Sequence, residues 1–374
     1  MIDQSFEQFA KRVMSGEARG FGAATLRCAL AIAEPFYAMA MRLRNWSYSR
    51  GLIATHRLSV PVISVGNITT GGTGKTPLVI WLARELAARG RRPAIILRGY
   101  KSRGGVSDEQ RVLESALAGV ATVVANPDRV SAGKTLLESG TSVDVILLDD
   151  GFQHRRLSRD FDLVLIDATA PFGFGHALPR GLLREPLSGL ERADAFVRTR
   201  VDQADPATLS AIDSELRSRN RDAPIYQSRH VMRSLLAANG DSIAPEQLRG
   251  RRMLAFCGIG NPQSFNAQLT DLGAVVVGLE AFADHHDYSE PDMTGLNERA
   301  RSAGAEFLVT TEKDWAKVEK LAGWISLPLW RVGLDIEIED GGLPLLRQIE
   351  QKLASAIATT AVASPSGEAE ETRV

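Results

Sequence analysis

The stretch Val62-Ile-Ser-Val-Gly-Asn-Ile-Thr-Thr-Gly-Gly-Thr-Gly-Lys-Thr-Pro77 decides the fold of this 374-residue chain. An apolar run predicts a buried strand, a glycine-rich turn follows it, and Gly74-Lys75-Thr76 opens an amphipathic helix. In such an arrangement, backbone N–H groups surround phosphate oxygens, a lysine neutralises their charge, and a hydroxyl can ligate Mg²⁺. We therefore predict a phosphate-binding loop, with nucleotide-binding residues Thr70, Gly71, Gly72, Thr73, Gly74, Lys75 and Thr76.

This loop departs at one position from the strict phosphate-loop pattern, because Thr69 stands where that pattern has glycine. Gly71 and Gly72 lie inside the loop instead. The alternative is a glycine-rich turn with a solvated lysine, but a strand before the loop and a helix after it favour phosphate binding.

A second buried strand ends in acidic residues, in Val143-Asp-Val-Ile-Leu-Leu-Asp-Asp-Gly-Phe-Gln-His154. Strands of a parallel sheet end at the same edge, where the phosphate loop also opens. A carboxylate at this place typically holds Mg²⁺ or its water ligands. We therefore predict Asp149 and Asp150, together with Thr76, as metal-binding residues; a purely structural Asp-Asp-Gly turn is the alternative.

Strand-like and helix-like segments alternate through the rest of the chain, which is typical of a parallel sheet with helical crossovers. Strands are expected at 60–65, 94–97, 121–124, 143–148, 163–166, 253–257, 274–279, 307–310 and 327–332, and helices at 75–89, 108–118, 129–139, 262–272, 290–303 and 313–321. The fold class is α/β: a P-loop NTPase-like core domain (59–225), a second, smaller α/β domain (226–355) and a disordered tail (356–374). The irregular segment 171–181, rich in Pro and Gly, is expected to be a functional loop.

The first 58 residues form a separate helical segment that is apolar, aromatic and basic. No uncharged run approaches the roughly 18–20 residues of a spanning helix, and Pro35 is expected to end or kink a helix. One interpretation is a helical pair lying in a membrane interface. The other is a helical hairpin packed on the protein's own core.

Composition excludes several classes of protein. Hydrophobic residues make up 44% and charged residues 24%, which argues against a disordered or fibrous chain. A net charge of −1 gives no bulk attraction for nucleic acid. Cys28 and Cys257 are too few for a disulfide framework or a four-cysteine zinc site.

Several further motifs accompany the phosphate loop in a fixed order: Arg98-Gly-Tyr100, Ser107-Asp-Glu109, Asp149-Asp-Gly-Phe-Gln-His154, Leu182-Leu-Arg-Glu-Pro186, Ala283-Asp-His-His286 and Thr311-Glu-Lys-Asp314. With this combination, residues 20–350 resemble the tetraacyldisaccharide 4′-kinase family. The resemblance implies ATP-dependent phosphorylation, with Mg²⁺, of the 4′-hydroxyl of an acylated glucosamine disaccharide 1-phosphate, giving lipid IVA in lipid A biosynthesis. It also implies a peripheral protein at the cytoplasmic face of the inner membrane of a Gram-negative bacterium, two α/β domains closing on a nucleotide, and no obligate protein partner.

The resemblance also assigns residue roles. Asp108 corresponds to the base that accepts the sugar hydroxyl proton, and His285 to its histidine partner, with His286 as a neighbour that could be confused with it. Lys75 and Arg129 correspond to residues that stabilise phosphoryl charge, and Glu109 lies beside the metal. Gln153, Arg184 and Glu185 occupy further active-site positions, and the role of Thr311–Asp314 is open apart from capping a helix.

Without the resemblance, plainer interpretations stand. Arg129 would be a solvated or ion-paired residue, His285 a structural one, and Asp108 and Glu109 charges that favour the first turn of a helix. Two other functions are alternatives for this sequence: a nucleotide-switch or metal-insertion NTPase of the same fold that acts on a protein partner, and a membrane-associated nucleotide-binding scaffold without phosphoryl transfer.

Overall fold

The computed structural model describes residues 4–99, 107–237, 241–260, 262–283 and 286–363. The strands are β1 (Val62–Asn67), β2 (Pro93–Leu97), β3 (Thr122–Ala125), β4 (Val145–Asp149), β5 (Phe161–Asp167), β6 (Ala195–Thr199), β7 (Ile225–Ala237), β8 (Ser242–Ile243), β9 (Arg252–Cys257), β10 (Val275–Ala281), β11 (Phe307–Thr311) and β12 (Leu329–Ile338). The helices are α1 (Gln4–Ser15), α2 (Phe21–Ser49), α3 (Lys75–Ala88), α4 (Asp108–Ala116), α5 (Arg129–Glu138), α6 (Pro206–Arg219), α7 (Pro262–Asp271), α8 (Glu290–Ser302), α9 (Glu312–Val318) and α10 (Leu343–Ala363).

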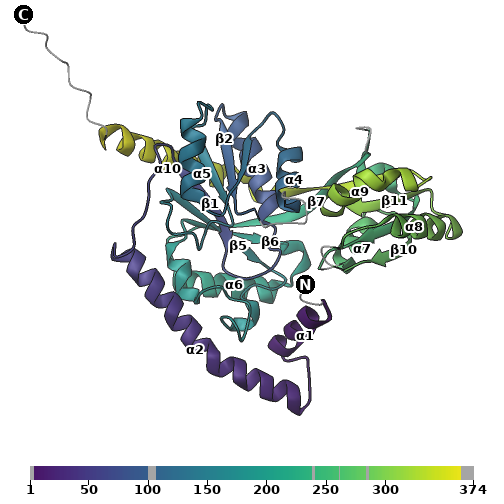
Figure 1. The fold of residues 1–374 in the computed structure, drawn as a ribbon, viewed down its shortest axis with the longest axis horizontal. Helices are drawn as coiled ribbons and strands as arrows, with labels where there is room; N and C mark the ends of the chain where they lie inside the picture. The colour runs from purple at the N-terminus through teal and green to yellow at the C-terminus, as the bar shows by residue number, and fades with distance from the viewer. Residues whose placement is uncertain (1–3, 100–106, 238–240, 261, 284–285, 364–374) are drawn as a thin grey trace, which may run out of the picture.

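The molecule has two lobes (Figure 1): the first contains β1–β6, and the second contains β9–β11 with α7, α8 and α9. One continuous sheet runs through both lobes. Its order is β10-β9-β11-β12-β7-β6-β5-β1-β4-β2-β3, with β8 paired to β7. The strands of the first lobe are parallel, as the alternating pattern predicts, so the α/β class is confirmed. Every residue of β1, β2, β4, β5 and β6 is buried, because helices cover both faces.

The strand β7 joins the two lobes. Its first residues pair in parallel with β6, and from Ser228 onward it pairs antiparallel with β12. The predicted domain limit at 225/226 falls at the start of this strand, so the sheet crosses the limit without interruption. The sequence pattern missed β7 because its buried residues do not form a continuous apolar run.

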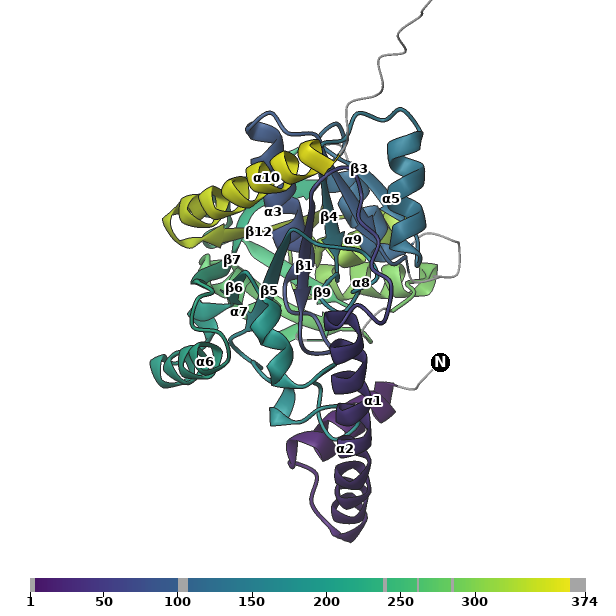
Figure 2. The same cartoon turned by 90° about the vertical axis from the view of Figure 1, so that its left-hand side faces the viewer.

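The last helix, α10, packs on the first lobe. Leu345, Leu346, Ile349 and Leu353 belong to the same buried cluster as Leu78 and Leu82 of α3, and Figure 2 shows α10 lying across α3. The prediction placed residues 343–355 in the second domain, and the structure places them on the core domain instead. Residues 356–363 continue this helix, so this part of the predicted disordered tail is wrong; the remainder, 364–374, lies outside the described residues.

The N-terminal segment contains one long helix, α2, which continues through Pro35. Of the two effects expected of Pro35, ending or kinking a helix, the first does not occur. Pro35 is exposed, so no neighbouring element meets its ring. At such an exposed position, water can satisfy the carbonyl that loses its N–H partner. Figures 1 and 2 show the N-terminal half of α2 extending away from the core, with α1 beside it.

Candidate functional site

The phosphate loop connects β1 to α3 as predicted, and glycine permits its backbone conformation. Gly74 caps α3 with φ 84° and Gly71 has φ 118°, both in the region that side chains disfavour. The helix begins at Lys75, so its N-terminal amides lie at the end of the loop. This geometry provides an anion-binding site at the carboxyl edge of the sheet.

Lys75 lies between two oxygen-bearing side chains. Its Nζ donates to Oδ1 of Asn67 at 3.2 Å and lies 3.5 Å from Oδ1 of Asp150. Asp150 follows β4, which is hydrogen-bonded to β1 in a register that pairs Val65 with Asp149. The structure therefore brings the lysine and the acidic pair together, as the sequence predicted from their positions at strand ends.

Asp150 is engaged by two cations. Nη1 of Arg184 lies 2.7 Å from both of its carboxylate oxygens. Burial opposes ionisation of Asp150, but Lys75 and Arg184 together lower its pKa. Asp150 also has a positive φ of 55°, a backbone conformation uncommon outside glycine. Arg184, predicted as an active-site position, is thus placed directly at the acidic pair.

Asp149 is the more buried acid, with 4% of its surface exposed. Burial and the neighbouring charge of Glu109 together raise its pKa to about 7, against the opposing effect of Lys75. Its Oδ1 atom is buried without a hydrogen-bond partner among the described residues. A buried carboxylate oxygen in this state is suited to a cation.

These residues fit a magnesium ion held together with nucleotide phosphates. Within the described ranges, no three His, Cys, Asp or Glu side chains gather closely enough to hold a metal ion. Mg²⁺ in phosphoryl-transfer sites, however, usually takes only one or two carboxylates and completes its shell with phosphates and water. The open oxygen of Asp149 and the Thr76 hydroxyl at the start of α3 match that requirement.

Arg129 and His154 flank the acidic pair. Arg129, the first residue of α5, is 5% exposed and its Nη2 donates to the backbone oxygen of Asp149 at 3.3 Å. Arg129 is therefore not a solvated surface residue, and the other plain interpretation, an ion-paired residue, stays open. Burial and the nearby charge of Arg129 lower the pKa of His154 to about 4, so this imidazole is neutral at pH 7.

The predicted base and its partner are only partly described. Ser107 caps α4 by accepting from the backbone N–H of Gln110 at 3.2 Å, and Asp108 is the first residue of that helix. The side chain of Asp108 and all of His285 lie outside the described residues. His286 is engaged elsewhere, since its Nε2 lies 3.2 Å from Asp292 and its ring stacks on Phe282.

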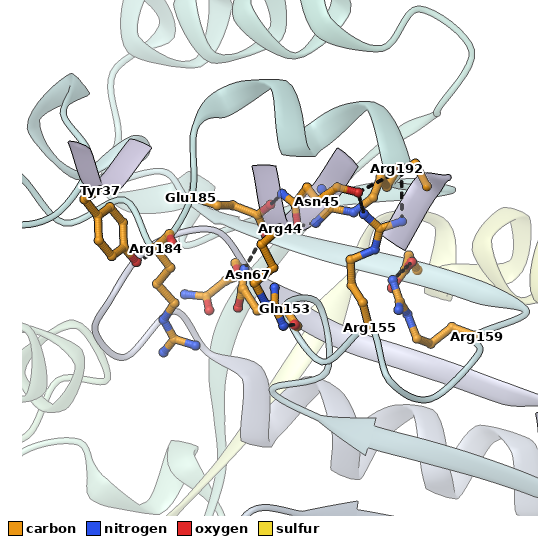
Figure 3. A network of polar contacts seen from close by, with 12 residues as sticks. Tyr37, Arg44, Asn45, Asn67, Gln153, Arg155, Arg159, Arg184, Glu185 and Arg192 are labelled. Carbon is orange, nitrogen blue, oxygen red and sulfur yellow. Dashed lines mark hydrogen bonds and ion pairs between the residues drawn. The ribbon is translucent and has the colours of Figure 1, made fainter. Parts of the chain in front are cut away.

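Gln153 and Glu185 form a buried polar hub that ties the site to α2 (Figure 3). Glu185 is fully buried and accepts from Asn45 at 2.7 Å, from Gln153 at 2.9 Å and from Arg192 at 2.9 Å. Gln153 also donates to the backbone oxygen of Asn67 at 2.9 Å. Glu185 therefore holds the loops around the site in place and does not face a substrate.

Further contacts attach the C-terminal half of α2 to the core. The Tyr37 hydroxyl donates to the backbone oxygen of Arg184 at 2.6 Å, and Arg44 donates to that of Gln153 at 2.9 Å. Glu34 accepts from the backbone N–H of Ala177, within the segment 171–181 that the sequence marked as functional. The helix thus contacts the same loops that carry Gln153 and Arg184.

The opposite face of α2 is apolar and exposed. Phe21 is 90% exposed, Phe36 72%, Ile32 69%, Met39 66% and Leu43 60%. One face of α2 therefore contacts the core, and the other presents apolar side chains to the surroundings, so the membrane-interface interpretation stays a prediction. In the described part of the chain, no helix combines the length and the apolarity needed to cross a membrane.

The Thr311–Asp314 motif organises the second lobe. Oγ1 of Thr311 accepts from the backbone N–H of Asp314 at 3.1 Å, which caps α9. The buried carboxylate of Asp314 accepts from the Thr311 hydroxyl at 2.6 Å and from the Gly258 N–H at 2.9 Å. The predicted helix cap is confirmed, and the motif also fixes the turn that follows β9.

Sequence reasoning missed several residues at this site. Asn45, Tyr37 and Arg192 reach the site from distant segments, and Thr199, Arg200 and His230 lie behind the phosphate loop. None belongs to a motif with a known spacing. The sequence signal for the contacts between α2 and the core was limited to the polar residues that interrupt the apolar segment 20–53.

Comparisons with known proteins agree on one family. The family model described as tetraacyldisaccharide-1-P 4′-kinase matches residues 26–354. A tetraacyldisaccharide 4′-kinase of Anaeromyxobacter sp. (strain Fw109-5) is 38% identical over 362 residues, covering 92% of this chain and 96% of that protein. One of Geobacter metallireducens is 42% identical over 312 residues, covering 77% and 88%. The crystal structure of LpxK from Aquifex aeolicus in complex with ATP superposes with a TM-score of 0.70 at 30% identity, covering 88% of this chain and 99% of that one.

Proposed function

This chain belongs to the tetraacyldisaccharide-1-P 4′-kinase family, and on that premise we propose how its site carries out the reaction. The enzyme transfers the γ-phosphoryl group of ATP to the 4′-hydroxyl of a tetraacylated glucosamine disaccharide 1-phosphate, a step of lipid A biosynthesis that yields lipid IVA. The alternative, an NTPase that acts on a protein partner, is not favoured because the relatives are named as kinases.

The observation that carries the assignment of the site is the meeting of Lys75, Asp149 and Asp150 at the ends of β1 and β4. Lys75 neutralises charge on the β- and γ-phosphates, and Arg129 adds positive charge beside Asp149. Asp149 and Thr76 would hold Mg²⁺, which would neutralise phosphate charge when bound. Arg184 keeps Asp150 ionised and oriented, and Glu109 lies close enough to influence the same charges.

The acceptor is activated by Asp108. As the 4′-oxygen forms its bond to the γ-phosphorus, the bond from that phosphorus to the bridging oxygen of ADP breaks, and the hydroxyl proton passes to the Asp108 carboxylate. The helix that begins at Asp108 packs against α9 of the second lobe. His285 assists this carboxylate, as the family resemblance implies.

The lipid acceptor reaches the site along α2 from a membrane surface. Exposed apolar side chains line one face of the helix, and exposed Arg42 and Arg50 suit anionic headgroups. The other face contacts the loops that carry Arg184 and Gln153. Since the acceptor is a lipid and ATP is cytoplasmic, we place the protein peripherally at the cytoplasmic face of the inner membrane.

The reaction is tested by transfer of radiolabelled γ-phosphate from ATP to tetraacyldisaccharide 1-phosphate in detergent micelles. Lys75→Ala is expected to lower the rate by orders of magnitude while leaving the circular dichroism spectrum unchanged, because the part-buried Lys75 does not belong to the hydrophobic core. Lys134→Ala, on α5, is the control. A Lys75→Ala protein with wild-type transfer would exclude the assigned site.

The membrane contact is tested by sedimentation with vesicles that contain an anionic phospholipid. The triple variant Ile32→Ser, Phe36→Ser, Met39→Ser removes apolar surface from α2 and is expected to sediment much less. A control variant replaces three other exposed apolar side chains by serine, at Val275, Trp324 and Leu343, which are less exposed than those of α2. Equal sedimentation of the two variants would show that α2 does not face the membrane.

A further inference from the structure

The side of the phosphate loop that faces away from the nucleotide is held by side chains from the end of β6. The hydroxyl of Thr199, which is fully buried, donates to the backbone oxygen of Thr73 at 3.0 Å. Nη2 of Arg200 donates to the backbone oxygen of Gly72 at 2.9 Å. Arg200 is itself fixed by an ion pair with Asp167, at the end of β5. Two successive carbonyl groups of the loop are therefore bound from behind.

The next residue of the loop, Gly74, is supported by His230 of β7. A Cβ atom placed on Gly74 would lie 2.8 Å from Nε2 of His230 and 3.8 Å from Cγ2 of Thr199. The imidazole thus fits against the bare Cα of the glycine. His230 Nε2 is buried and has no hydrogen-bond partner among the described residues. Three consecutive loop residues, 72 to 74, are accordingly in contact with β6, β7 or the residue that follows β6.

The direction of these contacts matters for phosphate binding. In a trans peptide the C=O and N–H bonds point in opposite directions. Binding the carbonyls of Gly72 and Thr73 on one side therefore turns the N–H groups of Thr73 and Gly74 toward the other side, where the phosphates bind. A loop rich in glycine has many accessible conformations, so fixing this one in advance lowers the cost of binding.

We propose that Thr199, Arg200 and His230 are positioning residues for ATP, which hold the amides of the phosphate loop toward the nucleotide phosphates. This proposal rests on the proposed function, because it requires the loop to bind ATP. His230 adds a link to the second lobe, since β7 pairs its residue 230 with Ile336 of β12. The geometry of β7, the strand that joins the lobes, therefore affects the affinity of the phosphate loop for ATP.

The test measures the Kd of ATP by calorimetry in the full-length protein. Thr199→Val keeps the shape of the side chain but removes the donor, and the loss of one such bond is expected to weaken binding about fivefold. Thr199→Ser keeps the hydroxyl and is expected to restore most of the affinity. Thr294→Val removes a hydroxyl bonded to a backbone carbonyl on the remote helix α8 and serves as the control.

Arg200→Met and His230→Ala are expected to weaken ATP binding by similar factors, and Arg200→Lys less than Arg200→Met. In the kinase assay, these changes raise KM for ATP several-fold, whereas KM for the lipid acceptor stays unchanged. A general loss of structure would instead lower kcat and alter both KM values.

The possible failures can be told apart. If the wild-type protein does not bind ATP, or if Lys75→Ala binds it equally well, the proposed function itself is wrong. If Lys75→Ala weakens binding while Thr199→Val, Arg200→Met and His230→Ala match Thr294→Val, the phosphate loop is correctly assigned and the positioning role is overturned.

Discussion

Replacing Glu185 by alanine is expected to destabilise the protein strongly, even though Glu185 does not face a substrate. Its carboxylate is fully buried and accepts hydrogen bonds from Asn45, Gln153 and Arg192. Removing it leaves the Arg192 guanidinium without its buried counter-charge and two amide donors short of an acceptor. Breaking a buried ion pair in this way costs about 3–5 kcal/mol.

The low end of this range applies here, because Gln153 keeps its bond to the backbone oxygen of Asn67. With an unfolding entropy of about 2.1 cal/mol/K per residue, a loss of about 3 kcal/mol in this 374-residue chain corresponds to a decrease in Tm of roughly 4 °C. The control is Glu337→Ala, which removes an exposed carboxylate paired with Arg229; such a surface pair contributes about 0–1 kcal/mol. Thermal unfolding followed by circular dichroism compares the two variants.

A second variant distinguishes the cost of leaving a buried charge unpaired from the cost of lost packing. Replacing both partners, as Glu185→Leu with Arg192→Met, removes the buried charges together and is expected to recover part of the lost stability. Because Asn45 belongs to α2, Glu185→Ala is also expected to raise KM for the lipid acceptor more than KM for ATP. If Glu185→Ala unfolds within a degree of Glu337→Ala, the polar hub does not stabilise the site.

Three further predictions concern other parts of the site. Asp108→Asn is expected to lose most phosphoryl transfer while ATP affinity stays within a few-fold, because the amide cannot accept the proton; wild-type transfer by this variant would remove Asp108 as the base. Gly66→Ala places a Cβ 2.6 Å from Cβ and 2.7 Å from the backbone N of Phe152, so urea unfolding is expected to show a loss of about 1–3 kcal/mol or more. Burial and the neighbouring Arg129 hold the pKa of His154 at about 4, below its unfolded value of about 6.5. The folded state therefore binds fewer protons than the unfolded state, and stability is lost as the pH falls from about 6.5 to about 4; unfolding curves of His154→Gln over this range should show a weaker pH dependence.

Local patterns in the sequence predicted the centre of the site. The apolar run before the glycines and the Gly-Lys-Thr at the helix start correspond to β1 and to α3, which begins at Lys75. Asp149 ends β4 beside β1, as expected for the ends of parallel strands. These predictions succeeded because strand, loop and helix adjoin in the chain, so that spacing alone fixes their relation.

The supporting contacts were not predictable in this way. Asn45 and Glu185 are 140 residues apart in the sequence. Thr199 donates to the backbone oxygen of Thr73, which precedes it by 126 residues. A bond from a side chain to a backbone oxygen leaves no periodic signal in the sequence. Pro35 is a different case, because the effect of a proline on a helix depends on its surroundings, and at this exposed position α2 continues past it.

The position of α10 has a consequence for synthesis of the protein on the ribosome. The strands and helices of the nucleotide-binding lobe are translated first, but α10 and β12 supply part of its buried core and are translated last. At about 5–20 residues per second, the apolar face of α3 and the edge of β7 that pairs with β12 wait several seconds or longer for their partners. Unpaired strand edges of this kind associate with other chains. A nascent chain truncated before α10 would therefore carry every residue of the phosphate loop and still lack a completed domain to hold it.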